Sequence, residues 1–149
     1  NDAKIFCVFD FDTVYGNKGN KKRHKEFVEN IKDNIDKGIV VLCPSMPSIE
    51  YWFLLHFKNS TDLIKTCGNK MNGLLTGYMK SYFPKSNKKI IDILKSEKYV
   101  KEPQWVKELC ANRKLETAIK RAEENIEKAL ASNALEEQSY SYVYKIFKS

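Results

Sequence analysis

Two short apolar runs, separated by an amphipathic segment, constrain the fold of this chain more than any other feature. The first run, Ile5–Phe9, is rich in β-forming residues and is ended by Asp10. In the segment Lys21–Lys37, apolar residues recur at three- and four-residue spacing, which is typical of one helix face. The second run, Ile39–Cys43, follows directly after Gly38, a helix stop. Continuous apolar runs are typical of strands buried on both faces, so the sequence predicts two parallel strands joined by a right-handed helical crossover.

The chain after Pro44, which should end the second strand, has a largely helical pattern. The segment Ile49–Phe57 is apolar nearly all round, as expected of a helix packed inside the molecule. Apolar spacing also predicts a short helix over Ile90–Leu94 and one long helix from Pro103 to Leu130. The aromatic segment Tyr140–Phe147 suits either a strand or a helix, and we favour a packed helix. The predicted fold is therefore α/β, with a short parallel, Rossmann-like sheet and a helical C-terminal half.

The length and the charge distribution bound the organisation of the chain. A length of 149 residues predicts a single domain. Residues 1–57 hold eight basic and eight acidic residues, whereas residues 58–149 hold eighteen basic and eleven acidic ones and carry the whole net charge of +7. A basic half suggests an anionic partner, most simply nucleic acid, although a lysine-rich solvated surface explains it equally well.

Several classes of protein are excluded by what the sequence lacks. No apolar run approaches the ~18 residues of a membrane span, so we expect no membrane partner. The four cysteines include no C-x-x-C pair, which indicates a reducing, cytoplasmic location without a disulfide framework or a zinc site. The chain also has no G-x-x-x-x-G-K phosphate loop, so nucleotide hydrolysis by this chain alone is not expected.

The clearest chemical signal is a pair of aspartates, Asp10 and Asp12, at the end of the first predicted strand. In open α/β sheets, ligands bind beyond the carboxyl ends of the strands. Two carboxylates at that edge can converge on one hard cation, and Mg²⁺ (or Mn²⁺) prefers such oxygen ligands. The alternative is a solvated turn, in which the aspartates only hydrogen-bond neighbouring backbone groups. We favour the metal site.

Two further candidates lie on the predicted helix Ile49–Phe57. Glu50 follows Ser48, a suitable N-cap residue, and would therefore lie in the first helical turn. There it could be a metal ligand, or it could only interact favourably with the helix dipole. His56, near the end of the helix, could be catalytic, or it could be a hydrogen-bonded core histidine, which is the commoner role on an apolar helix.

Two basic clusters are candidate nucleic-acid contacts: Lys21, Lys22 and Arg23, and then Lys88 and Lys89. The first cluster follows the Asp-x-Asp loop and could hold phosphates near the metal. The second follows an aromatic stretch that ends at Pro84, and aromatic residues beside lysines suit single-stranded nucleic acid. In both cases the alternative is a set of solvated lysines on the surface.

These residues together resemble the RloB-like family. The family carries an Asp-x-Asp at a strand end, as in Phe9–Asp12, and then a segment of the form S-N-P-x-[FI]-E-x-W-x-L-x-H-F. The segment Ser45–Phe57, which reads SMPSIEYWFLLHF, is similar to it and departs from it at Met46, where Asn is usual. Later stretches, Tyr82–Lys85 and Ala118–Ala122, also resemble the family, so the resemblance covers most of the chain.

The resemblance implies a Toprim-type domain and a role in bacterial phage defence by abortive infection, often with an AAA-type or ABC-type ATPase. It implies that Asp10 and Asp12 bind Mg²⁺, that Glu50 is an additional acidic ligand, and that Lys85 stabilises a phosphate in the transition state. The family pattern also places a glutamate after a strand upstream of the aspartates. Because no such strand precedes Lys4, we expect a fragment that lacks an N-terminal segment.

We therefore expect a single RloB-like domain over residues 1–149, with an α/β metal-site part in 1–57 and a basic, mostly helical part in 58–149. The favoured function is a Mg²⁺-dependent, Toprim-type nuclease in which Glu50, His56 and Lys85 are the catalytic candidates. One rival is a non-catalytic module that binds nucleic acid or a partner protein. Another is an Asp-x-Asp phosphatase, in which Asp10 would be the nucleophile and Asp12 the acid.

Overall fold

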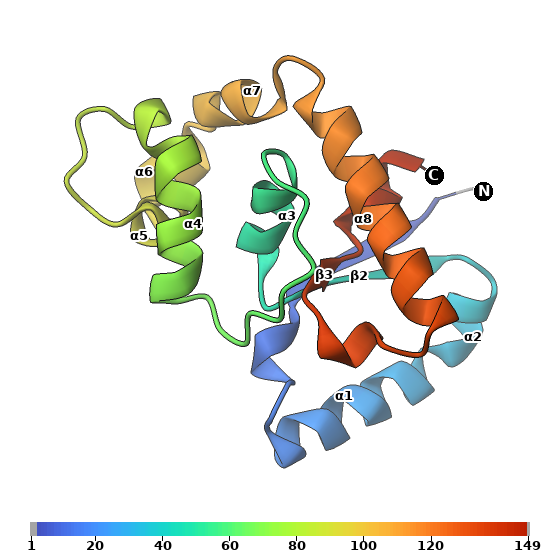
Figure 1. The fold of residues 1–149 in the computed structure, drawn as a ribbon. Coiled ribbons are helices and arrows are strands. Elements are labelled where there is room, and N and C mark those ends of the chain that lie inside the picture. The colour runs from blue at the N-terminus through green and yellow to red at the C-terminus, as the bar shows by residue number, and fades with distance from the viewer. Residues whose placement is uncertain (1–2, 149) are drawn as a thin grey trace.

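The structure, a computed structural model, describes residues 3–148, and the sheet within them has three strands (Figure 1). β1 (Ile5–Asp10) and β2 (Val40–Met46) are parallel neighbours, and β3 (Tyr140–Ser141) pairs antiparallel with the end of β2. The predicted α/β class and the two parallel strands are confirmed. The sheet as a whole is mixed and not purely parallel, because the third strand comes from the end of the chain and runs the opposite way.

The crossover between the parallel strands consists of two helices, α1 (Lys18–Asn30) and α2 (Lys32–Asp36), in place of the single helix predicted. The two helices divide at Ile31, whose φ of −108° and ψ of 13° interrupt the helical backbone. Gly38 follows α2 with a φ of 72°, a left-handed conformation that glycine adopts without steric cost. This turn leads the chain directly into β2.

β1 is less buried than its continuous apolar run predicts. Ile5 is 59% exposed and Val8 is 43% exposed. The reason is that β1 lies at one end of the strand order, with β2 as its only strand neighbour among residues 3–148. Burial on both faces applies to the central strand β2, where Val40, Cys43 and Met46 are all buried.

The C-terminal part of the sheet corrects two predictions. β2 continues through Pro44, which was expected to end it. Proline cannot donate a backbone hydrogen bond, but the Pro44 carbonyl still accepts one from the Tyr142 N–H at 2.9 Å. The packed helix predicted for Tyr140–Phe147 is wrong, because β3 pairs there with β2 and is followed by a 3₁₀ helix, η4 (Val143–Lys148).

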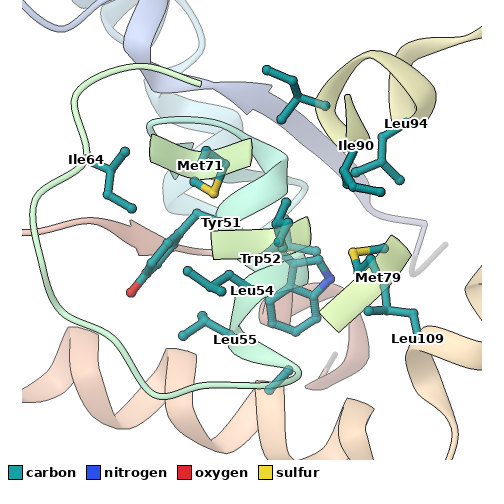
Figure 2. Close-up of a cluster of buried hydrophobic side chains, with 14 of the residues drawn as sticks. Tyr51, Trp52, Leu54, Leu55, Ile64, Met71, Met79, Ile90, Leu94 and Leu109 are labelled. Atoms are coloured by element: carbon teal, nitrogen blue, oxygen red, sulfur yellow. The ribbon is translucent and has the colours of Figure 1, made fainter. Parts of the chain in front are cut away.

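Helix α3 (Ile49–Leu55) lies at the centre of the molecule, with α4 (Asn69–Met79) and α5 (Ile90–Lys95) on one side and α8 (Lys114–Ala131) on the other (Figure 1). The apolar pattern all round this segment is explained by its position, since neighbouring elements cover it on several sides. Its side chains that are fully shielded from solvent are Tyr51, Leu54 and Leu55, and Figure 2 shows them within the main cluster of buried residues.

The long helix predicted from Pro103 to Leu130 is instead two helices, α7 (Gln104–Cys110) and α8. They are separated where Asn112 and Arg113 adopt left-handed φ values of 56° and 64°, which no helix continues through. The remaining short elements are η1 (Phe11–Thr13), η2 (Lys80–Tyr82), α6 (Glu97–Lys101) and η3 (Leu135–Glu137). Across residues 3–148, the structure contains no helix with the length and apolar character needed to cross a membrane.

Candidate functional site

The end of β1 places the two aspartates of the Asp-x-Asp motif at the carboxyl edge of the parallel strands. β1 ends at Asp10, and the chain then enters the 3₁₀ turn η1, whose first turn contains Asp12. The backbone N–H of Asp12 donates to the Pro47 carbonyl at 2.9 Å. This bond connects η1 to the link between β2 and α3, so Asp10 and Asp12 both lie at the carboxyl end of β1.

The start of α3 lies against the same edge. Ser48 occupies the N-cap position, as predicted, but its side chain makes no capping hydrogen bond. The acceptor comes instead from β1, since Oδ1 of Asp10 accepts a hydrogen bond from the Ile49 N–H at 2.9 Å. A carboxylate at a helix start is also favoured by the helix dipole. Asp10 therefore connects the strand end to the helix start.

Glu50 lies in the first turn of α3 and is almost completely buried, with 3% of its surface exposed. Its Oε2 atom has no hydrogen-bond partner within residues 3–148. Burying a polar atom without a hydrogen-bond partner is costly, because the atom loses its hydration and makes no bond to replace it. A bound cation would supply the partner that this oxygen lacks.

Glu50 and Asp12 are both close enough to Asp10 for their charges to act on it. Burial raises the pKa of Asp10 above its ordinary value, and the negative charges of Glu50 and Asp12 raise it further. The hydrogen bond from Ile49 and the positive charge of Lys95 act in the opposite direction. Glu50 and Asp12 therefore lie near enough to Asp10 for their charges to act on it, and the role of the three residues as metal ligands remains a prediction.

Two residues near this site were missed by the sequence analysis, namely Lys95 and Cys67. Burial raises the pKa of the Cys67 thiol to about 11, with Ser48, Glu50 and Lys95 as its interacting neighbours. Cys67 comes from the loop before α4, and Lys95 comes from the last turn of α5. Nothing in the sequence signals that either lies near Glu50, because the proximity depends on how α4 and α5 pack beside α3.

His56 lies just past the opposite end of α3, about 9 Å along the helix axis from Glu50 at 1.5 Å per residue. It is buried, and its Nδ1–H donates to the Trp52 carbonyl at 2.9 Å, since a carbonyl can only accept. Its Nε2 has no partner among the described residues. Burial lowers the pKa of His56 to about 4, and the positive charges of Lys114 and Arg121 lower it further. His56 is therefore a neutral residue outside the carboxylate cluster.

The basic candidates occupy two separate surfaces. Lys21, Lys22 and Arg23 are exposed on α1. Lys85, Lys88 and Lys89 are exposed in the segment before α5. A lysine outside both clusters, Lys95, is the one whose charge lowers the pKa of Asp10.

The family model described as RloB-like protein matches residues 1–149, the whole chain. The chain belongs to the RloB-like family. No curated protein and no solved structure matches it.

A metal site in this RloB-like protein would have to use fewer than three protein ligands. Within the described residues, no three His, Cys, Asp or Glu side chains form a group that could hold a metal ion. Mg²⁺ is usually bound through one or two carboxylates, with water or substrate phosphate completing its coordination. The unpaired Oε2 of Glu50 and the neighbouring carboxylates of Asp10 and Asp12 fit that requirement.

Proposed function

We propose that this RloB-like protein is a Mg²⁺-dependent nuclease of the Toprim type that acts in bacterial phage defence with an AAA-type or ABC-type ATPase partner. The observation that carries the proposal is the buried Oε2 atom of Glu50, which has no hydrogen-bond partner among residues 3–148 and belongs to a carboxylate near Asp10. The negative charges of Glu50 and Asp12 disfavour the charged form of Asp10, and a bound cation would offset that cost. The basic C-terminal region supports the choice of an anionic polymer as the substrate.

In this proposal each residue of the site has a defined task. Asp10, Asp12 and Glu50 are the candidate ligands, of which one or two would bind the ion directly, and the Ile49 N–H fixes the orientation of the Asp10 carboxylate. When bound, Mg²⁺ supplies an activated water and neutralises charge on the scissile phosphate. Lys95, whose positive charge already acts on Asp10, would counter the remaining negative charge of the phosphate.

The second candidate is a non-catalytic module that binds nucleic acid or a partner protein. It is favoured by the absence of any three-residue metal-binding group within residues 3–148. In that case Asp10 would serve only as the cap of α3.

The test is calorimetric titration with Mg²⁺ and with Mn²⁺, comparing the wild type with the double variant Asp10→Ala/Asp12→Ala. A matched control removes two exposed carboxylates from α2, as Asp33→Ala/Asp36→Ala. We expect the wild type and the control to bind metal and the site variant not to bind. Cleavage of single-stranded and duplex DNA and RNA is then measured on the same proteins. A wild type that binds no metal would contradict the proposal and favour the binding module.

A further inference from the structure

β1 has a strand neighbour on one side only. Within residues 3–148 it pairs with β2 and lies at the outer end of the sheet (Figure 1). A free strand edge presents unpaired backbone N–H and C=O groups, and proteins often protect such an edge with a lysine or a proline inside the strand. The sequence of β1, IFCVFD, contains neither, and the side chains of Ile5 and Val8 are 59% and 43% exposed. The edge of β1 is therefore suited to pairing with another strand.

The hydrogen bonding between β1 and β2 determines which backbone groups face this edge. The Ile5 N–H donates to the Ile39 carbonyl at 2.8 Å, so the backbone of Ile5 faces β2. Successive residues of a strand direct their N–H and C=O groups to opposite sides of it, so Phe6 and Val8 direct theirs away from β2. A strand that docks on the edge of β1 would bond to these two residues.

Two antiparallel copies of β1 complement each other in their apolar side chains. Residues that face the edge must lie opposite each other, and one register that meets this condition places Phe6 opposite Val8 of the second copy. Ile5 then lies opposite Phe9 of the second copy. Each exposed β-branched residue thus gains a phenylalanine as its cross-strand partner, a combination that stabilises sheets.

The same register pairs opposite charges at both ends of the interface. Lys4 precedes β1, is exposed, and would lie opposite Asp10, the last residue of β1, in the second copy. Oδ1 of Asp10 accepts from the Ile49 N–H, which leaves Oδ2 for an ion pair. A shift of the register by two residues in one direction places Phe6 opposite Asp10, and a shift in the other places Val8 opposite Lys4. Charge complementarity therefore favours a single register.

We propose that β1 is a dimer interface, on which β1 of a second copy docks antiparallel and joins the two sheets into one. This pairing uses the same surface on both copies, so it closes as a twofold dimer and does not extend into a filament. The twofold axis passes beside Cys7, which lies opposite Cys7 of the second copy in a pair without mutual hydrogen bonds. The Cα atoms of such a pair are about 4.5 Å apart, within the ~4.4–6.8 Å that a disulfide spans. The dimer goes beyond the proposed nuclease function and does not depend on it.

The test measures the mass of the whole chain by light scattering over a range of concentrations, in EDTA, so that metal binding plays no part. Val8→Lys places a charge in the middle of the interface, and Val106→Lys makes the same change at a comparably exposed position on α7, where the valine is 38% exposed. Lys4→Glu places a carboxylate opposite Asp10, and Lys120→Glu makes the same change at an exposed position on α8. Thermal melts confirm that each variant is folded.

We expect the wild type, Val106→Lys and Lys120→Glu to approach twice the mass of one chain as the concentration rises, and Val8→Lys to keep the mass of one chain. Lys4→Glu should raise the Kd of the dimer by about tenfold, because two attractive charge pairs become repulsive. A dimer that survives Val8→Lys would overturn the proposal. A wild type that stays monomeric at every concentration would also overturn it and would leave the edge of β1 to a strand of another protein.

Oxidation with diamide tests the register. Diamide takes up two protons and two electrons as two thiols become one disulfide. The wild type should give a disulfide-linked dimer on a non-reducing gel, and Cys7→Ser should give none. Cys67→Ser and Cys110→Ser remove the other two partly buried cysteines and should keep the cross-link. A dimer that gives no cross-link, or one whose cross-link persists in Cys7→Ser, would overturn the proposed register.

Discussion

The carboxylate of Asp10, the last residue of β1, accepts a hydrogen bond at 2.9 Å from the backbone N–H of Ile49, the first residue of α3. The two residues are 39 positions apart in the chain. One side chain thus stabilises the start of the central helix and also belongs to the candidate metal site. Substitutions at this position must therefore separate a structural effect from a functional one.

Comparing Asp10→Asn with Asp10→Ala separates the structural effect from the functional one. Asn keeps an oxygen that can accept from the Ile49 N–H and removes a charge that burial and the neighbouring carboxylates disfavour. We expect Asp10→Asn to be at least as stable as the wild type in EDTA, and Asp10→Ala to lose about 1 kcal/mol through loss of the cap. Both variants should lose metal binding. Thermal unfolding and calorimetry on the same samples check this, and equal destabilisation by Asn and Ala would contradict it.

Asp12→Asn distinguishes the metal site from a phosphatase. In a two-ligand metal site, Asp10→Asn and Asp12→Asn should each reduce metal affinity, by about 10-fold or more. In an Asp-x-Asp phosphatase, Asp10 would form a covalent phospho-aspartate, which Asp10→Asn would abolish and Asp12→Asn would leave able to form. Acid-quenched protein exposed to a radiolabelled phosphate ester reports the covalent species. We expect no covalent species in the wild type. A label that is present in the wild type and in Asp12→Asn but absent from Asp10→Asn would favour the phosphatase.

Glu50→Gln tests whether the buried carboxylate is present for function. Removing the charge of a side chain that is 3% exposed and has an unpaired oxygen should stabilise the metal-free protein. Metal affinity and cleavage should fall by about 10- to 100-fold or more. Glu124→Gln, the same change at an exposed position on α8, should alter neither property. Urea unfolding in EDTA measures stability, and calorimetry measures metal affinity. A loss of stability in Glu50→Gln would contradict a functional role for the buried carboxylate.

Several parts of the fold and the site follow from the sequence because they depend on local pattern. The apolar run before Asp10 predicts β1, and the position of Ser48 places Glu50 in a first helical turn. By contrast, β3 has only two residues, and its pairing with Ser45 and Met46 depends on a contact between distant parts of the chain.

The same limit explains what was missed at the site. The interaction of Lys95 with Asp10 arises from the packing of α5 beside α3, and no local pattern of apolar residues reports it. The break between α7 and α8 has a different cause. Asn112 and Arg113 take left-handed φ values that their residue types do not predict, although Asn tolerates such values better than most residues.

The low pKa of His56 predicts how stability depends on pH. In the folded protein the pKa is about 4, against an ordinary value of 6.5, so between these values the unfolded chain binds a proton that the folded chain does not. Stability is therefore fully present above pH 6.5 and is lost as the pH falls toward 4, by about 2 kcal/mol between pH 7 and pH 5. Urea unfolding at both pH values should show a smaller loss in His56→Gln. The matched change at the chain's other histidine, His24→Gln, should keep the wild-type loss, and the same loss in His56→Gln would refute the assignment.

Arg121 connects α8 to the far end of α3 and should matter more than its neighbour on the same helix. Its Nη1–H donates to the Leu55 carbonyl at 2.9 Å, where the end of α3 leaves backbone oxygens unpaired and favours a positive charge. Arg121→Met keeps most of the apolar stem but loses this charged hydrogen bond, so we expect a cost of about 1.5–3 kcal/mol. Lys120→Met, at an exposed position, should change stability by less than about 0.5 kcal/mol. Because the charge of Arg121 also lowers the pKa of His56, Arg121→Met should reduce the loss of stability between pH 7 and pH 5. Equal unfolding midpoints for the two variants in urea would show that the bond to Leu55 does not hold α8 against α3.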